Sequence, residues 1–117
     1  MTYPSHMQPL PFPTAAVQAA ADQCRSMATL VDERMALAST AAVDARAGWA
    51  GAYADDFGIA WPDTELSASE LSERLRRLAG ELDDAVTAAA DENTRRAGLR
   101  ADWDCQHDPD RPRNVPC

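Results

Sequence analysis

One long segment without helix-breaking residues limits the fold more than any other feature of this sequence. No proline or glycine occurs between Pro13 and Gly48, a stretch of about 34 residues that spans about 50 Å as an α-helix. Apolar and small residues recur along it every three or four positions, which places them on one helical face. These residues are Val17, Ala20, Cys24, Met27, Val31, Met35, Ala38, Ala42, Ala45 and Trp49. With Thr14 as its N-cap, the segment predicts a helix over residues 14–48.

A second helical pattern follows after a break. Its apolar residues have the same spacing and are Leu71, Leu75, Leu78, Leu82, Val86 and Ala89, with a weaker continuation to Trp103. The sequence Ser67-Ala68-Ser69-Glu70 fits a capping box, so we predict a helix over 67–103. Because Pro62 disfavours helical geometry at the residue before it, we predict a turn with a short helix of its own over 49–66.

Two arms of similar length joined by a compact turn predict an all-α fold, a long antiparallel helical hairpin over 14–103. Residues 1–13 contain four prolines and are expected to be flexible or extended. Residues 104–117 hold three more prolines among charged residues and are expected to form an irregular, exposed tail.

The composition predicts a thin core. The chain is 45% hydrophobic but only 6% aromatic, and much of the remainder is alanine, so an isolated hairpin would be marginally stable. Pairing with a second hairpin would form a four-helix bundle dimer and cover the remaining apolar positions. The expected helix-interface residues are Val17, Met27, Leu30, Val31, Met35, Leu37, Leu71, Leu75, Leu78, Leu82 and Val86.

Charge and motif content exclude several classes of function. A formal net charge of −8 argues against nucleic acid and anionic membrane surfaces as partners. Charged residues interrupt the first arm, so no membrane helix or stable membrane insertion is expected, and residues 1–13 lack the features of a Sec-type signal peptide. No nucleophile–base constellation or phosphate-binding loop occurs. We therefore expect no enzyme, no cofactor and no resident metal.

The three cysteines are Cys24, Cys105 and Cys117. Cys24 lies on the apolar face of the first arm and is expected to be a small core residue. Cys105 and Cys117 would close a small loop in the tail if the protein meets an oxidising compartment. A metal or redox sensor built on Cys105, His107 and Cys117 is a weaker alternative, because their spacing matches no closed set of four ligands.

The turn between the arms carries a distinctive motif. Trp49-Ala50-Gly51 is followed by Phe57 and, one helical turn later, by Trp61. On its own, a tryptophan beside a glycine-containing turn is typical of a hydrophobic lid over a core. Together with the chain length and the hairpin, however, the motif resembles the small Esx-like WXG proteins of type VII secretion systems. The resemblance covers about residues 14–103.

The resemblance implies a hairpin that dimerises with itself, with a sister WXG-like protein or with the N-terminal domain of a larger effector. It implies a type VII secretion substrate or the targeting partner of such an effector, secreted by a Sec-independent route or cytoplasmic before export. Two features depart from the family: the break at Pro62 and the lack of a tyrosine followed four residues later by an acidic residue near Trp103. The alternative from another class is a cytosolic adaptor, immunity or antitoxin-like hairpin that binds one protein and is never exported.

Overall fold

The computed structural model describes residues 2–117, which contain helices and no strand. The elements are a short 3-10 helix, η1 (Ser5–Met7), and two α-helices, α1 (Thr14–Ala47) and α2 (Ala52–Gln106). These residues form two compact units. The hairpin unit is residues 15–83, and the strap unit is residues 2–14 together with 84–117. The predicted all-α helical hairpin is confirmed.

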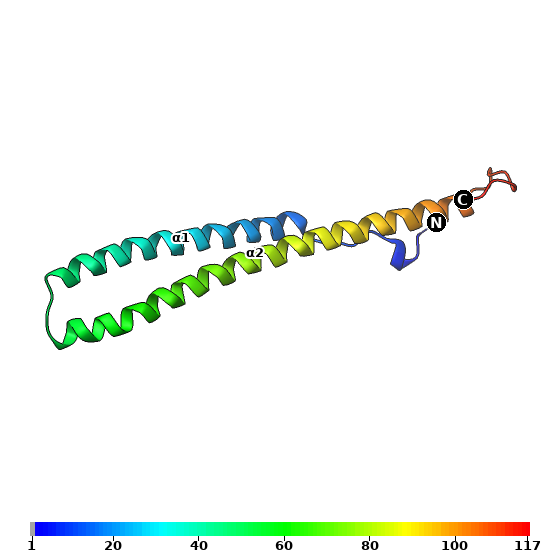
Figure 1. Ribbon diagram of the computed structural model, residues 1–117. Coiled ribbons are helices and arrows are strands. Elements are labelled where there is room, and N and C mark those ends of the chain that lie inside the picture. The colour runs from blue at the N-terminus through cyan, green and yellow to red at the C-terminus, as the bar shows by residue number, and fades with distance from the viewer. Residues whose placement is uncertain (1) are drawn as a thin grey trace. The chain divides into compact units, whose positions relative to one another are not determined.

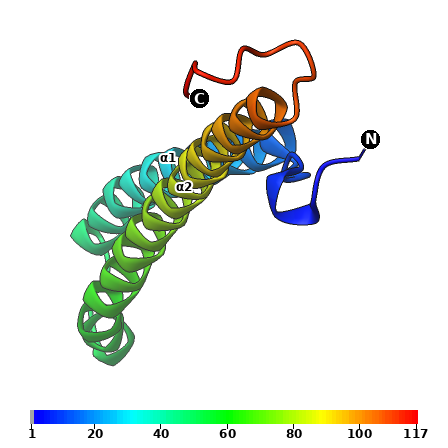
Figure 2. The ribbon, with the colours of Figure 1, turned by 90° about the vertical axis from the view of Figure 1, so that its right-hand side faces the viewer.

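In the hairpin unit, α1 and the first part of α2 run side by side in opposite directions (Figures 1 and 2). Cross-helix contacts define their register. Arg25 pairs with Asp83, Arg76 with Asp32, and the Ser39 hydroxyl lies 3.3 Å from a carboxylate oxygen of Glu65. The residue numbers of these partners fall on one helix as they rise on the other, as an antiparallel pair requires.

The predicted break at Pro62 is wrong. The connection consists of residues 48–51 alone, and α2 begins at Ala52 and continues through Pro62 and through the sequence that resembled a capping box. A proline in a helix removes one hydrogen bond and crowds the carbonyl of the residue four positions earlier, which here is Gly58. Contacts with α1 occur on both sides of the proline, at Gly58 and at Glu65. This packing holds the two parts of α2 in one register, so the local preference for a break is overridden.

Small side chains fill the seam between the two helices of the hairpin unit. The buried residues there are Ala21, Ala28, Ala42, Ala54, Ser72 and Ala79. Most stand in a seven-residue repeat, for example Ala21 and Ala28 on α1 and Ser72 and Ala79 on α2. Such a repeat keeps one stripe of each helix facing its partner, and small residues on that stripe let the two backbones approach closely.

The predicted interface residues are therefore not the buried core of a single chain. Val17, Val31, Met35, Leu75, Leu82 and Val86 are half-buried. Met27, Leu30, Leu37, Leu71 and Leu78 remain exposed. The thin core that the composition predicts is present, since no large side chain in residues 2–117 is fully buried.

The strap unit differs from the sequence-based expectation at both ends. Residues 2–13, expected to be flexible or extended, include η1 and form hydrogen bonds to α2. The second helix extends to Gln106, so the first residues of the predicted irregular tail are helical. Turns and bends follow, and the Cys105–Cys117 disulfide joins the end of α2 to the last residue.

Candidate protein-binding surface

Three aromatic side chains from both sides of the turn form one cluster. The ring centroids of Trp49 and Phe57 are 5.7 Å apart, and those of Phe57 and Trp61 are 5.4 Å apart with nearly parallel planes. Both separations favour aromatic pairing. The motif residues of the sequence thus meet in space and close the end of the hairpin, although 44% of Trp49 stays exposed.

Gly51 makes the reversal of the chain possible. Its φ angle is +106°, a conformation that other residues rarely adopt, and its carbonyl accepts a hydrogen bond from the amide of Asp55 in the first turn of α2. A surface hollow of about 600 Å³ lies beside the turn, and its lining includes Val43, Trp49 and Asp55. The turn therefore combines a glycine-dependent reversal of the chain with an accessible, partly apolar surface.

A second glycine lets an arginine of α1 approach α2 closely. A Cβ atom added at Gly58 would lie 2.7 Å from a guanidinium nitrogen of Arg46. The side chain of Arg46 therefore occupies the space that any larger residue at position 58 would need.

One side of the hairpin is closed by ion pairs between the two helices. We call Arg25, Asp32, Arg76 and Asp83 the polar flank; Arg25 bonds to Asp83, and a nitrogen of Arg76 lies 2.6 Å from an oxygen of Asp32. The hydrogen bond from Arg76 lowers the pKa of Asp32, and the carboxylate of Asp83 raises the pKa of Arg25. These exposed pairs contribute modest stability but fix the register.

The opposite side of the hairpin is apolar. Each of three polar-flank residues, Asp32, Arg76 and Asp83, follows a seam residue by four positions. The corresponding seam residues are Ala28, Ser72 and Ala79. The residue immediately before each of these seam residues lies on the side of the seam away from the polar flank, and it is apolar in all three cases. These apolar residues are Met27 on α1 and Leu71 and Leu78 on α2.

Two further leucines widen this apolar side on α1. Leu30 stands three residues after Met27 and is its neighbour on the helical surface, and Leu37 follows seven residues after Leu30, in the same row along the helix. We call Met27, Leu30, Leu37, Leu71 and Leu78 the apolar flank. Their exposed fractions run from 45% at Leu78 to 69% at Leu37. Several exposed large apolar side chains beside one seam are typical of a surface that a partner covers.

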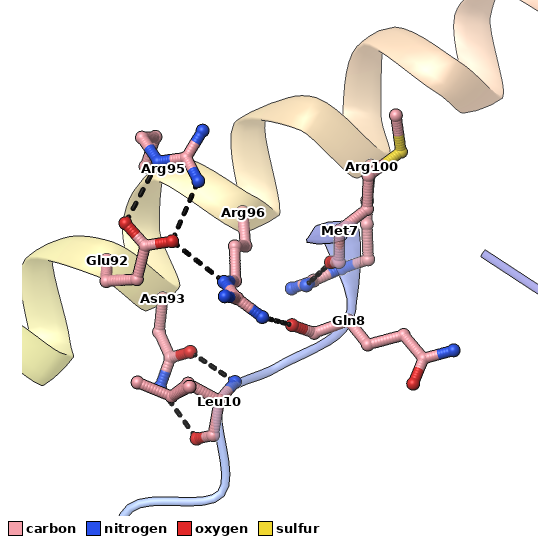
Figure 3. Close-up of polar contacts among 8 residues, drawn as sticks. All are labelled: Met7, Gln8, Leu10, Glu92, Asn93, Arg95, Arg96 and Arg100. Atoms are coloured by element: carbon pink, nitrogen blue, oxygen red, sulfur yellow. Dashed lines mark hydrogen bonds and ion pairs between the residues drawn. The ribbon is translucent and has the colours of Figure 1, made fainter. Parts of the chain in front are cut away.

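The N-terminal strap, residues 3–10, lies along α2 in the strap unit. Figure 3 shows its contacts with Asn93, Arg96 and Arg100. Beside them, Glu92 accepts hydrogen bonds from both Arg95 and Arg96, and these bonds lower its pKa from 4.5 to about 2. This contact was not predicted, because its only signal in the sequence is polar side chains three and four apart on α2 and a segment rich in proline.

Titration of Glu92 tests this arrangement. Because the folded-state pKa is depressed, the stabilisation is complete above the unfolded value of 4.5 and is lost as the pH falls through about 2. A ¹³C NMR titration of the Glu92 carboxyl should have a midpoint near 2, and it should move toward 4.5 when both arginines are replaced by alanine. A wild-type midpoint near 4.5 would contradict the paired geometry.

The tail contains the disulfide and a stacked histidine. The Cα atoms of Cys105 and Cys117 are 5.9 Å apart, and Cys24 is a free, half-buried thiol on α1. The rings of Trp103 and His107 stack at 4.0 Å, with Nδ1 of His107 2.8 Å from the carbonyl oxygen of Trp103. Residues 2–117 contain no group of three or more His, Cys, Asp or Glu side chains arranged to hold a metal ion.

The disulfide predicts a simple thiol count. Protein isolated without reductant and then denatured should react with Ellman's reagent at one thiol per chain, Cys24, and at all three after reduction. As a control, Cys117→Ser should give two reactive thiols with or without reductant, because only Cys24 and Cys105 remain. Three reactive thiols in the unreduced wild-type chain would contradict the pairing.

Comparisons with known proteins identified no related protein. No family model, no curated protein and no solved structure matches the chain. No helix within residues 2–117 has both the length and the apolar character to cross a membrane. The turn and the two flanks of the hairpin are therefore the features that bear on function.

Proposed function

We propose that this chain is a protein-interaction module that completes a four-helix bundle with a second helical hairpin. The observation that carries the proposal is the difference between its two sides. Ion pairs close the polar flank, whereas the five side chains of the apolar flank stay 45–69% exposed.

Bundle formation suits the energetics of this hairpin. Its seam is made of alanine and serine, so each contact removes little apolar surface from water. Full burial of a leucine or methionine side chain contributes about 1.5–3 kcal/mol, and those of the apolar flank are only about half covered. A partner hairpin packed on this flank would supply the large-residue core that one chain lacks.

The turn motif adds a biological setting to this proposal. The cluster of Trp49, Phe57 and Trp61 and the left-handed Gly51 support an Esx-like WXG function. The chain then acts as a type VII secretion substrate, or as the targeting or chaperone partner of a larger secreted effector. Its partner is a second copy, a sister WXG-like protein or the N-terminal domain of that effector.

Multi-angle light scattering tests the interaction directly. A mass of twice 12.7 kDa at micromolar concentration, falling toward 12.7 kDa on dilution, is expected for a homodimer. A monomer at all concentrations that also retains no partner from native lysate would overturn the proposal.

The export step needs its own experiment. Culture filtrate from a wild-type strain and from a strain without the type VII system should differ in the amount of this protein. Retention of the chain inside both strains, while it still binds its partner, would instead favour a non-exported adaptor or an immunity or antitoxin-like hairpin.

A further inference from the structure

The strap unit contains a row of polar side chains on one face of α2. Asn93, Arg96, Arg100 and Asp104 are spaced three, four and four residues apart, so they follow each other along one side of the helix. Figure 3 shows three of them directed toward the N-terminal strap. We call Asn93, Arg96 and Arg100 the main-chain ladder.

The ladder recognises the backbone of the strap and not its side chains. The Leu10 amide donates to Oδ1 of Asn93 at 2.6 Å, and Nδ2 of Asn93 donates to the Leu10 carbonyl oxygen at 3.3 Å. Arg96 donates to the carbonyl oxygen of Gln8 at 2.9 Å. Arg100 donates to the carbonyl oxygen of Met7 at 2.6 Å. These bonds require a main chain with free carbonyls at Met7 and Gln8 and a free amide at Leu10.

Proline suits the strap to this site. Pro9 and Pro11 have no N–H group and restrict φ, so the segment around them enters the site already extended. Leu10, between them, has the one amide of this tripeptide, and that amide is the group paired with Asn93. A segment that is extended before it binds loses less conformational entropy on binding.

The ladder is itself held in position. Oε1 of Glu92 accepts a hydrogen bond from Nε of Arg96 at 2.9 Å, which leaves Nη1 directed at the strap. Arg95, next in sequence, donates two hydrogen bonds to Glu92 and makes none to the strap. The guanidinium of Arg96 is therefore oriented by Glu92 for its bond to the strap, as in a preformed binding site.

Apart from these bonds, the strap is only partly buried, with Tyr3, Pro4, Met7 and Leu10 half-buried. Ser5, His6, Gln8 and Pro9 are exposed, and its far end is fixed by one side-chain contact, the Tyr3 hydroxyl donating to the Asp104 carboxylate at 2.8 Å. Any chain with the same sequence would make the same bonds.

We propose that the ladder is a docking site for an extended, proline-rich segment, filled here by the chain's own strap and open to exchange with the strap of a second copy. This inference goes beyond the hairpin interface described above and does not depend on it. It assigns the N-terminal segment a binding role, with the ladder of another copy as its partner.

A synthetic peptide of residues 2–13 can stand in for the second copy's strap. Unlabelled peptide is added to the ¹⁵N-labelled full chain and followed by NMR. The amides of Met7, Gln8 and Leu10 should shift to the positions of an undocked segment, while those of residues 93–104 should stay nearly unchanged. Since a tethered strap competes at an effective concentration on the order of millimolar, half displacement should need millimolar peptide.

Matched controls define the result. A peptide with Leu10→Pro lacks the amide that Asn93 accepts and should displace nothing. In the full chain without peptide, Arg96→Ala combined with Arg100→Ala should speed hydrogen exchange of the Leu10 amide by about tenfold or more. Arg95→Ala removes a neighbouring positive charge that makes no bond to the strap and should leave that exchange unchanged.

Two outcomes would overturn the proposal. Strap amides that exchange at random-coil rates in the wild-type chain would mean that the ladder binds nothing. The second is that the strap amides are protected but do not shift when the peptide concentration is ten times the effective concentration of the tethered strap. The strap would then be a fixed structural element that does not exchange.

Discussion

Replacement of Leu71 and Leu78 by glutamate is expected to abolish hairpin association while leaving the single chain folded. Both side chains lie on the apolar flank and are 48% and 45% exposed in one chain. A partner hairpin would bury their remaining apolar surface, and each carboxylate would have to be desolvated there without an ion-pair partner. Each substitution should then cost at least about 3 kcal/mol of association, which weakens the dimer more than about 100-fold.

The measurement is sedimentation or light scattering together with far-UV circular dichroism. Glutamate is nearly as good a helix former as leucine, so the helical signal should persist in the double variant. Ile59→Glu is the matched control, because Ile59 is also a large exposed apolar residue of α2, at 75%, but does not belong to the apolar flank. Equal loss of association in the control, or none in the double variant, would contradict the assigned interface.

The helical hairpin could be predicted because its signals are local. The absence of proline and glycine before Gly48 and the three-and-four spacing of apolar residues define α1 to within one residue of its observed end at Ala47. The break at Pro62 failed for the opposite reason: the cost of one proline is local, but the contacts that offset it come from α1. The helix-breaking preference of proline considers one helix by itself, so it takes no account of contacts with a second helix.

The division between core and interface could be predicted only in part. The spacing identified the apolar faces, but it did not distinguish residues inside the seam from those beside it. The seam selects small residues such as Ala28 and Ala79 because the backbones lie close, and it leaves larger ones such as Met27 and Leu78 at its side. A seven-residue repeat of alanine and serine in the sequence was the available signal.

The strap and the tail show how far separation in sequence limits prediction. The contacts of the ladder join residues 83 to 93 positions apart, and backbone carbonyls leave no mark in a sequence. The Cys105–Cys117 pair was accessible to sequence reasoning because its separation is only 12 residues.

Replacement of Pro62 by alanine is expected to stabilise the chain more than any other single change considered above. Alanine restores the hydrogen bond to the carbonyl of Gly58 and removes the crowding of the ring, a gain of up to about 3 kcal/mol in the free energy of unfolding. Pro62 is exposed, so no packing is lost.

For a domain of this size, each 1 kcal/mol shifts Tm by about 4 °C, so the melting temperature measured by circular dichroism should rise by up to about 12 °C. Pro112→Ala, outside both α-helices, is the control and should leave Tm unchanged. An unchanged Tm in Pro62→Ala would mean that α2 already accommodates the ring at no cost. The continuity of α2 would then be an intrinsic property of this segment and would not depend on packing against α1.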